Sequence, residues 1–334
     1  MTSATLFLDL EGIELTSEEQ MLLRDTLIGG VILFARNTQS AEQVKCLVES
    51  IRVINPDCII SVDQEGGRVQ RLKEGVTRLP PVQALHSLYA ENPEQGCRAA
   101  RDLGYLMAAE MRLLDVDISY APVLDVDYGH NDVIGDRAFA NSVEAVTALS
   151  GAYILGLSDA GMAATGKHFP GHGWVSSDTH LEGASDSRSF EELMQADLKP
   201  FIRAIENGIE AMMLAHVVYP ECDRDPAGFS RFWLTDILKN MFGFQGVVFS
   251  DDLSMNAAQS AGSYEDRVKA ALKAGCQAIL CCNERSGTIE ILKYMHSINC
   301  TPLKTLASLK GREWHPDQSR LNAARDLAKQ LVTS

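Results

Sequence analysis

The sequence has little positive charge for its length. Its 334 residues include 30 Lys and Arg against 45 Asp and Glu, which gives a formal net charge of −15 at pH 7. Nucleic acids and anionic membranes bind to positive surfaces, so we expect neither as a partner. A local cluster of Lys and Arg would still allow an anionic small-molecule substrate.

The sequence also lacks the usual marks of export and of membrane insertion. The first residues contain no basic leader, and their apolar run stops at Asp9, too early for a signal peptide. No apolar run approaches the roughly 20 residues of a membrane-spanning helix. The eight cysteines form no Cys-x-x-Cys pair, and Cys58, Cys281 and Cys282 lie inside apolar runs. We therefore expect reduced thiols in a cytoplasmic protein, in preference to disulfides or a metal site.

Short apolar runs alternate with amphipathic segments along the chain, and 46% of the residues are hydrophobic. The runs expected to form strands are 6–10, 30–34, 59–62, 117–121, 162–165, 211–215, 246–250 and 278–281. Helical patterns follow most of them. One begins with the capping-box sequence at Ser40, a second opens at Ser189, and a third ends before Gly275. Eight such units in series predict an α/β protein, a single (β/α)8 TIM barrel that spans residues 1–334 as one catalytic domain.

Polar residues follow the same end of nearly every expected strand, and this pattern supports the barrel. Examples are Asp63 and Glu65 after the third run, His216 after the sixth and Asp251 after the seventh. In TIM barrels the active site lies at the C-terminal ends of the strands. An open, doubly wound sheet is the alternative, but its Gly-x-Gly-x-x-Gly turn after the first strand is absent.

The segment from Gly166 to Gly173, followed by Asp178 and His180, has the densest collection of reactive side chains. We expect it to form a loop rich in Gly and Pro after a strand. Residues two apart in an extended loop can face the same way, and a carboxylate beside an imidazole raises its pKa. His180 is therefore a candidate general acid and base near neutral pH, oriented by Asp178. The alternative is a solvated loop pair without a function.

Lys167 and His168 are expected to come directly after a strand. Lys167 could form a Schiff base, as in an aldolase, or it could hydrogen-bond a sugar hydroxyl. His168 and His172 are four residues apart, but Pro170 between them argues against one helix that presents both to zinc. We expect no metal and no cofactor.

Asp251 ends an apolar run, where a buried strand has no structural use for a carboxylate. It could cap a helix, but Asp252 or Ser254 could do so instead. We therefore predict that Asp251 is a nucleophile toward an electrophilic carbon and that Asp252 supports it through hydrogen bonds.

Asp63 and Arg71 flank a Gly-Gly pair that allows close approach of a ligand. Asp63 could accept two hydroxyl hydrogen bonds, and Arg71 could contact a hydroxyl or a carboxylate. A surface Arg–Asp pair is the alternative. Arg137 lies in a Gly-containing loop and is ambiguous on its own.

Taken together, these motifs resemble family 3 glycoside hydrolases. The resemblance rests on the segments 62–71, 167–173, 178–180 and 249–255, which occur in family order from the third to the seventh strand. It is closest to the bacterial β-N-acetylglucosaminidases of cell-wall recycling, a subgroup whose members are lone barrels. It implies that Asp251 is the nucleophile and that His180 is the proton donor and acceptor, oriented by Asp178. The residues it implies for binding the N-acetylglucosamine unit are Asp63, Arg71, Arg137, Lys167 and His168.

The reaction implied by the resemblance is retaining exo-hydrolysis through a covalent glycosyl-enzyme. The substrates would be muropeptides, in which N-acetylglucosamine is β-1,4-linked to 1,6-anhydro-N-acetylmuramic acid bearing a peptide. Since a neutral imidazole does not repel phosphate, an N-acetylglucosaminide phosphorylase is the second hypothesis. A third mechanism uses the acetamido group of the substrate as nucleophile, with Asp251 and Asp252 as a carboxylate pair. A Schiff-base aldolase and a sugar-binding barrel without catalysis are the alternatives from other classes.

Overall fold

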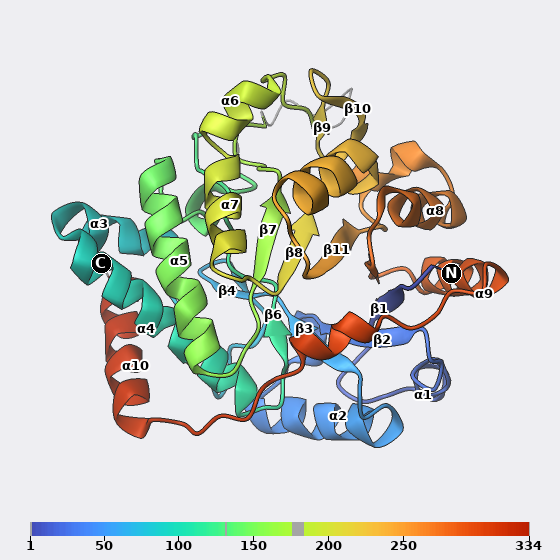
Figure 1. The fold of residues 1–334 in the computed structure, drawn as a ribbon. Coiled ribbons are helices and arrows are strands. Elements are labelled where there is room, and N and C mark those ends of the chain that lie inside the picture. Colours follow the sequence, from blue (N-terminus) through green and yellow to red (C-terminus); the bar gives the residue numbers. More distant parts are fainter. Residues whose placement is uncertain (1, 131, 176–183, 334) are drawn as a thin grey trace.

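The computed structural model describes residues 2–130, 132–175 and 184–333, which fold into a (β/α)8 barrel (Figure 1). The barrel strands are β1 (Thr5–Asp9), β2 (Ile28–Leu33), β3 (Ile59–Val62), β6 (Ile118–Ser119), β7 (Thr165–Phe169), β8 (Ala211–Leu214), β11 (Val247–Asp252) and β12 (Ala278–Cys281). Their order around the sheet is β6-β3-β2-β1-β12-β11-β8-β7, and neighbouring strands are parallel. A parallel bridge between Val123 and Lys167 joins the two outer strands and closes the barrel. The predicted fold class is confirmed.

Helices surround the sheet on its outer face (Figure 1). They are α1 (Ser17–Leu22), α2 (Ala41–Ile54), α3 (Leu85–Glu91), α4 (Pro93–Arg112), α5 (Val143–Asp159), α6 (Phe190–Gln195), α7 (Leu198–Glu206), a π-helical segment (Phe232–Met241), α8 (Tyr264–Ala274), α9 (Arg285–Ser297) and α10 (Gln318–Thr333). In the described ranges no helix is both long and apolar enough to cross a membrane.

Alternate residues of the barrel strands lie in two different hydrophobic cores, one outside the sheet and one inside the barrel. In β1, Leu6 and Leu8 belong to the core between the sheet and the helices, whereas Phe7 points into the barrel. The ring of Phe7 packs edge-to-face on Phe249 with centroids 5.1 Å apart. Gly30 of β2 provides the space for this ring, because a Cβ added at Gly30 would lie 2.0 Å from an atom of Phe7. The barrel interior is therefore a packed core.

A short 3-10 segment, Lys304–Leu309, closes the N-terminal end of the barrel. Leu303, Leu306 and Leu309 join the interior cluster together with residues at the starts of strands, such as Ile59 and Ala211. Further along the chain, helix α10 packs against α4 on the outside of the barrel.

Local sequence signals explain where several helices begin and end. Ser189 caps α6 with a full capping box, and Ser263 does the same for α8. Gly275 ends α8 in the left-handed conformation with φ of 115°. At Ser40 only half of the expected box forms, because the Gln43 side chain accepts from the backbone of Gln39.

The fifth barrel strand begins later in the sequence than we predicted. Residues 162–164 precede β7, and Lys167 and His168 lie inside the strand. Both side chains are buried, at 3% and 8% exposure. The expectation of a loop at these positions is wrong. Carboxylates pair with Lys167 and His168 and stabilise these polar side chains within a strand.

Two small antiparallel hairpins follow barrel strands at the C-terminal end. One consists of β4 (Gln64–Gly66) and β5 (Val69–Gln70), and the other of β9 (Val218–Tyr219) and β10 (Asp223–Pro226). In Figure 1, β7 and β8 point toward the end of the barrel where α6 and the β9–β10 hairpin lie. The polar residues that follow the strands therefore gather at this end.

Candidate active site

A buried cluster of alternating charges lies where β3 and β7 end. The Lys167 ammonium contacts Asp63 Oδ1 at 2.9 Å and Glu65 Oε1 at 2.6 Å. Arg137 makes a bidentate pair with Glu65, with Nε–Oε2 and Nη2–Oε1 distances of 2.8 and 2.9 Å. Arg71 Nη2 lies 3.4 Å from Asp63 Oδ2. Four of the five residues predicted to bind sugar thus form one cluster, connected through Glu65.

The charges of this cluster stabilise one another against the cost of burial. Burial alone would raise the pKa of Glu65, but the charges of Lys167 and Arg137 and their hydrogen bonds bring the pKa down to about 2. Burial alone would lower the pKa of Lys167, but Asp63 and Glu65 raise it. Lys167 is therefore held as an ammonium ion, which is not the free amine that a Schiff-base aldolase needs.

Several hydrogen-bonding groups of the cluster remain available to a ligand. An ammonium has three donors, and the two carboxylates use two of those of Lys167. The Nε of Arg71 is buried and has no hydrogen-bond partner among the described residues. A buried donor without a partner is costly, so a bound polar ligand would stabilise this arrangement. Sugar hydroxyls, which both donate and accept, match the site.

His168 is oriented by a second buried carboxylate, Asp125. Asp125 Oδ2 lies 2.7 Å from His168 Nδ1, and Asp125 also accepts from the backbone N–H groups of His168 and His172. Burial would raise the pKa of Asp125, but His168 and these hydrogen bonds lower it. With Nδ1 engaged, Nε2 is the ring nitrogen of His168 that is left for a ligand.

Asp251 and Asp252 end β11 and have different surroundings. Asp252 accepts from Ser254 N, Ser254 Oγ and Cys282 N at 2.9, 2.8 and 3.0 Å. Asp251 Oδ1 accepts only the N–H of Asp252, and its Oδ2 has no partner in the described part of the chain. Asp251 caps no helix, since Met255 is the residue that precedes the next helical segment. The two adjacent carboxylates therefore have different hydrogen-bond partners.

Electrostatics connect Asp251 with the rest of the site. Burial lowers the pKa of His172, and the charges of Asp125 and Asp251 oppose this effect, so His172 lies within range of both carboxylates. Burial also raises the pKa of Asp252 to about 6, and the neighbouring charge of Asp251 contributes to the increase.

Asp178 and His180 lie outside the described residues, and their roles stay predictions. The residues on both sides of segment 176–183 are held together by Arg188. Its guanidinium pairs with Asp186 at 2.6 Å and also with Asp197. It lies 4.5 Å from the ring centroid of Trp174, which precedes the segment.

Glu65 and Asp125 are functional candidates to which the sequence assigned no role. Both follow barrel strands, and that position was their only signal. Their partners are distant in sequence, since Arg137 is 72 residues from Glu65 and His168 is 43 residues from Asp125. Among the described residues, no group of His, Cys, Asp and Glu side chains is arranged to hold a metal ion.

Comparison with known proteins places the chain in a family. The model of the glycosyl hydrolase family 3 N-terminal domain matches residues 6–301. A beta-hexosaminidase of Tolumonas auensis is 48% identical over 311 residues, which cover 92% of each chain. A beta-hexosaminidase of Thiobacillus denitrificans is 46% identical and covers 99% of this chain and 93% of its own length. The chain belongs to glycosyl hydrolase family 3 and is a glycoside hydrolase.

Solved structures agree with this assignment. The crystal structure of NagZ from Neisseria gonorrhoeae in complex with N-trifluoroacetyl-D-glucosamine superposes with a TM-score of 0.91 at 39% identity, and the match covers 99% of both chains. A family 3 β-N-acetylglucosaminidase from Paenibacillus has a TM-score of 0.83 at 28% identity, over 98% of this chain and 66% of its own. The family expected from the motifs is confirmed.

Proposed function

We propose that this chain is a retaining exo-β-N-acetylglucosaminidase. The observation that carries the proposal is the cluster of Asp63, Lys167, Arg71 and Arg137 around Glu65, at the same end of the barrel as Asp251. Asp63 would accept from sugar hydroxyls, and the cations would donate to them. The N-acetylglucosamine derivative in the related NagZ structure and the names of the relatives support this substrate class.

The proposed reaction proceeds in two steps. In the first, the free oxygen of Asp251 attacks the anomeric carbon, the bond to the leaving oxygen breaks, and His180 gives that oxygen a proton. In the second, His180 takes a proton from water, and the water oxygen displaces Asp251 from the anomeric carbon. Asp178 would orient His180. The roles of His180 and Asp178 rest on their sequence motif and on membership of the family.

Direct attack by Asp251 can be tested by trapping the intermediate. The protein would be incubated with a slowly reacting fluorosugar analogue of N-acetylglucosamine, digested and analysed by mass spectrometry. We expect a sugar adduct on Asp251 and none on the Asp251→Asn variant. An oxazoline product without an adduct would instead assign the nucleophile to the acetamido group of the substrate.

The reaction type is tested by the acceptor. The assay compares nitrophenyl β-N-acetylglucosaminide with the matching β-glucoside, each with and without phosphate. We expect free N-acetylglucosamine from the first substrate and little turnover of the second. Formation of a sugar 1-phosphate would make the chain a phosphorylase, which the hydrolase names of the relatives do not favour.

We further propose that the natural substrates are muropeptides and that the enzyme acts in cytoplasmic peptidoglycan recycling, as one catalytic domain over residues 1–334. The eight cysteines are free thiols, in keeping with a reducing compartment. Burial raises the pKa of Cys58, Cys276 and Cys281 to about 12, so these thiols are unreactive. Cell fractionation and assay of the natural disaccharide-peptide would test location and substrate.

A further inference from the structure

Arg71 is held less tightly than the other cations of the proposed sugar-binding cluster. Lys167 and Arg137 pair with Glu65 at 2.6 to 2.9 Å, and their side chains are largely buried. Arg71 instead contacts Asp63 at 3.4 Å, and its side chain is 30% exposed. One long ion pair does not fix the plane of a guanidinium, which carries its N–H donors in a rigid fork. A second contact is therefore needed to direct the donors of Arg71.

Phe34 provides that second contact. It follows β2 directly and is half-buried, and its ring centroid lies 5.9 Å from Cζ of Arg71. A guanidinium within about 6 Å of an aromatic ring is attracted by the negative face of the ring. Further along the same loop, Thr38 Oγ1 donates to the backbone carbonyl of Arg71 at 2.9 Å. Segment 34–38 therefore contacts both the side chain and the backbone of Arg71.

A second arginine holds the ring of Phe34. Cζ of Arg36 lies 4.8 Å from the ring centroid, and the guanidinium of Arg36 forms an ion pair with Asp9. Carboxylates, guanidinium groups and the ring thus alternate in a series of contacts through Asp9, Arg36, Phe34, Arg71 and Asp63. This series links the C-terminal ends of β1, β2 and β3.

The backbone around Phe34 is fixed as well. Asn37 Oδ1 accepts from the N–H of Phe34 at 2.8 Å, and Asn37 Nδ2 donates to the carbonyl groups of Leu10 and Gly12 at 3.0 and 2.7 Å. Asn37 is fully buried. A group that binds a ligand is held precisely when the residues that support it are themselves locked by packing and hydrogen bonds. Phe34 is therefore a rigid support for Arg71.

We propose that Phe34 is a positioning residue that directs the guanidinium of Arg71 toward the N-acetylglucosamine unit. The inference rests on the proposed function, since it assigns to Phe34 an effect on the binding of that sugar. Arg71 Nε is buried and has no partner among the described residues, so the plane of the guanidinium decides whether this donor reaches a hydroxyl. With an aliphatic side chain at position 34, Arg71 would keep its charge and its pair with Asp63 but lose the ring that fixes its plane.

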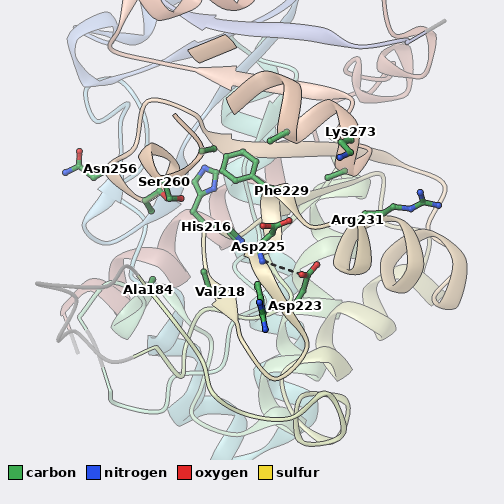
Figure 2. A pocket seen from close by; sticks show the side chains of 16 residues that line it. Ala184, His216, Val218, Asp223, Asp225, Phe229, Arg231, Asn256, Ser260 and Lys273 are labelled. Atoms are coloured by element: carbon green, nitrogen blue, oxygen red, sulfur yellow. Dashed lines mark hydrogen bonds between the residues drawn. The ribbon is translucent and has the colours of Figure 1, made fainter. Parts of the chain in front are cut away.

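A cavity of about 830 Å³ at the same end of the barrel does not include this series of contacts. It lies between the β9–β10 hairpin and the segment that follows β11, where Figure 2 shows His216 and Phe229. Neither Phe34 nor Arg71 lines it. A substitution of Phe34 therefore tests the sugar-binding cluster and leaves the lining of this cavity unchanged.

The test measures hydrolysis of nitrophenyl β-N-acetylglucosaminide by Phe34→Leu and Phe34→Tyr. A cation–π contact at a partly exposed site corresponds to about two- to fivefold in a binding constant, so Phe34→Leu should raise KM by about that factor. The value of kcat should change less than about twofold, because Arg71 contributes alike to the bound substrate and to the transition state. Phe34→Tyr keeps the aromatic face and should keep KM within about 1.5-fold of wild type.

Substitution of Arg71 separates positioning from a general structural effect. Arg71→Ala removes the group on which Phe34 acts and should itself raise KM. In that background Phe34→Leu should change KM by less than about 1.5-fold, because the effects of two residues that act through one contact are not additive. Thr38→Val removes the hydroxyl donor and keeps the shape of the side chain. It should raise KM about twofold with Arg71 present and have no effect without it.

Tyr105→Leu is the matched control for loss of an aromatic ring beside an arginine. The ring of Tyr105 lies 4.0 Å from Cζ of Arg320, where α4 packs against α10 in the outer layer. Its loss should lower the melting temperature and leave KM unchanged. The comparison shows whether lower stability alone raises KM.

An unchanged KM in Phe34→Leu would overturn the proposal, and so would an equal rise of KM with and without Arg71. If Phe34→Leu does not fold, Thr38→Val decides in the same way, because KM must rise and must do so only when Arg71 is present. These outcomes leave the proposed function intact as long as wild-type protein hydrolyses the nitrophenyl glycoside. Absence of that hydrolysis would refute the proposed function and the inference together.

Discussion

Replacement of Glu65 by glutamine removes one negative charge from the centre of the sugar-binding cluster and keeps the size of the side chain. Glu65 contacts the Lys167 ammonium at 2.6 Å and is paired bidentately with Arg137. Its side chain is 5% exposed, so water cannot reach the site to solvate the two cations after the charge is lost. The two cations would then lie in a buried site with Asp63 as their remaining close carboxylate.

The magnitude of the effect follows from the pKa of Glu65. The pKa falls from its ordinary 4.5 to about 2 in the folded protein, which corresponds to about 3 kcal/mol of unfolding free energy. Loss of one partner of a buried ion pair costs about 3–5 kcal/mol in other proteins, which agrees in size. We therefore expect Glu65→Gln to lower the unfolding free energy by about 3 kcal/mol, measured by urea denaturation at pH 7.

The pH dependence provides an independent check on this origin. Since the pKa is lowered by folding, the contribution of Glu65 is fully present above pH 4.5 and is lost as the pH falls toward 2. The stability difference between wild type and Glu65→Gln should therefore shrink below pH 4.5. We also expect KM for nitrophenyl β-N-acetylglucosaminide to rise, because Lys167 and Arg137 lose the group that orients them.

Glu110→Gln is the matched control for a buried carboxylate. Glu110 accepts from Thr77 and pairs with Arg325 Nε at 3.0 Å, in the outer layer of the barrel. Its replacement should lower stability with KM unchanged. If Glu65→Gln kept both wild-type stability and wild-type KM, the reasoning about the cluster would be refuted.

Three further changes have expected outcomes. Asp125→Asn should lower kcat/KM about tenfold to a hundredfold, because His168 loses the charged group that orients it; an unchanged value would argue against that role. The pKa of Asp252 is raised to about 6, so its contribution to stability is greatest at low pH and decreases as the pH rises through 6. Through Asp252 the wild-type protein should lose about 1 kcal/mol of unfolding free energy between pH 5 and pH 7, and Asp252→Asn should not show this loss. Urea denaturation at both pH values measures the difference, and identical pH profiles for the two proteins would contradict the prediction. Gly30→Ala should lower stability by about 1–3 kcal/mol through its clash with Phe7, whereas Gly12→Ala, with no atom within 4 Å of the new Cβ, should have little effect on the melting temperature.

Much of the barrel could be predicted because its strands are short apolar runs. The runs 59–62 and 278–281 coincide with β3 and β12, and most of the others are displaced by one or two residues. The β7 strand was misplaced because Lys167 and His168 are polar and burial of a strand residue is ordinarily signalled by an apolar side chain. The β10 strand has the sequence Asp-Arg-Asp-Pro, which contains no strand signal at all.

The candidate site could be predicted only where a residue's own position gave a signal. Asp251 was found because a carboxylate at the end of an apolar run is unusual. Asp63, Arg71 and Lys167 were candidates from their positions near strand ends and a Gly-Gly pair, and the resemblance to a family then favoured sugar binding by these three residues and by Arg137. The connecting role of Glu65 depends on contacts between residues far apart in sequence, and such contacts follow from the closed barrel and not from any local pattern.

The floor made by Lys304–Leu309 has a consequence for synthesis of the chain on the ribosome. All eight barrel strands are translated before Leu306 and Leu309 leave the exit tunnel. Before that point, the apolar side chains of Phe7, Ile59 and Val247 lack the leucines that pack with them in the finished fold. A pause in translation just before this segment would prolong the exposure of these apolar side chains. A stop codon placed there would release a chain whose barrel interior is uncovered at its N-terminal end.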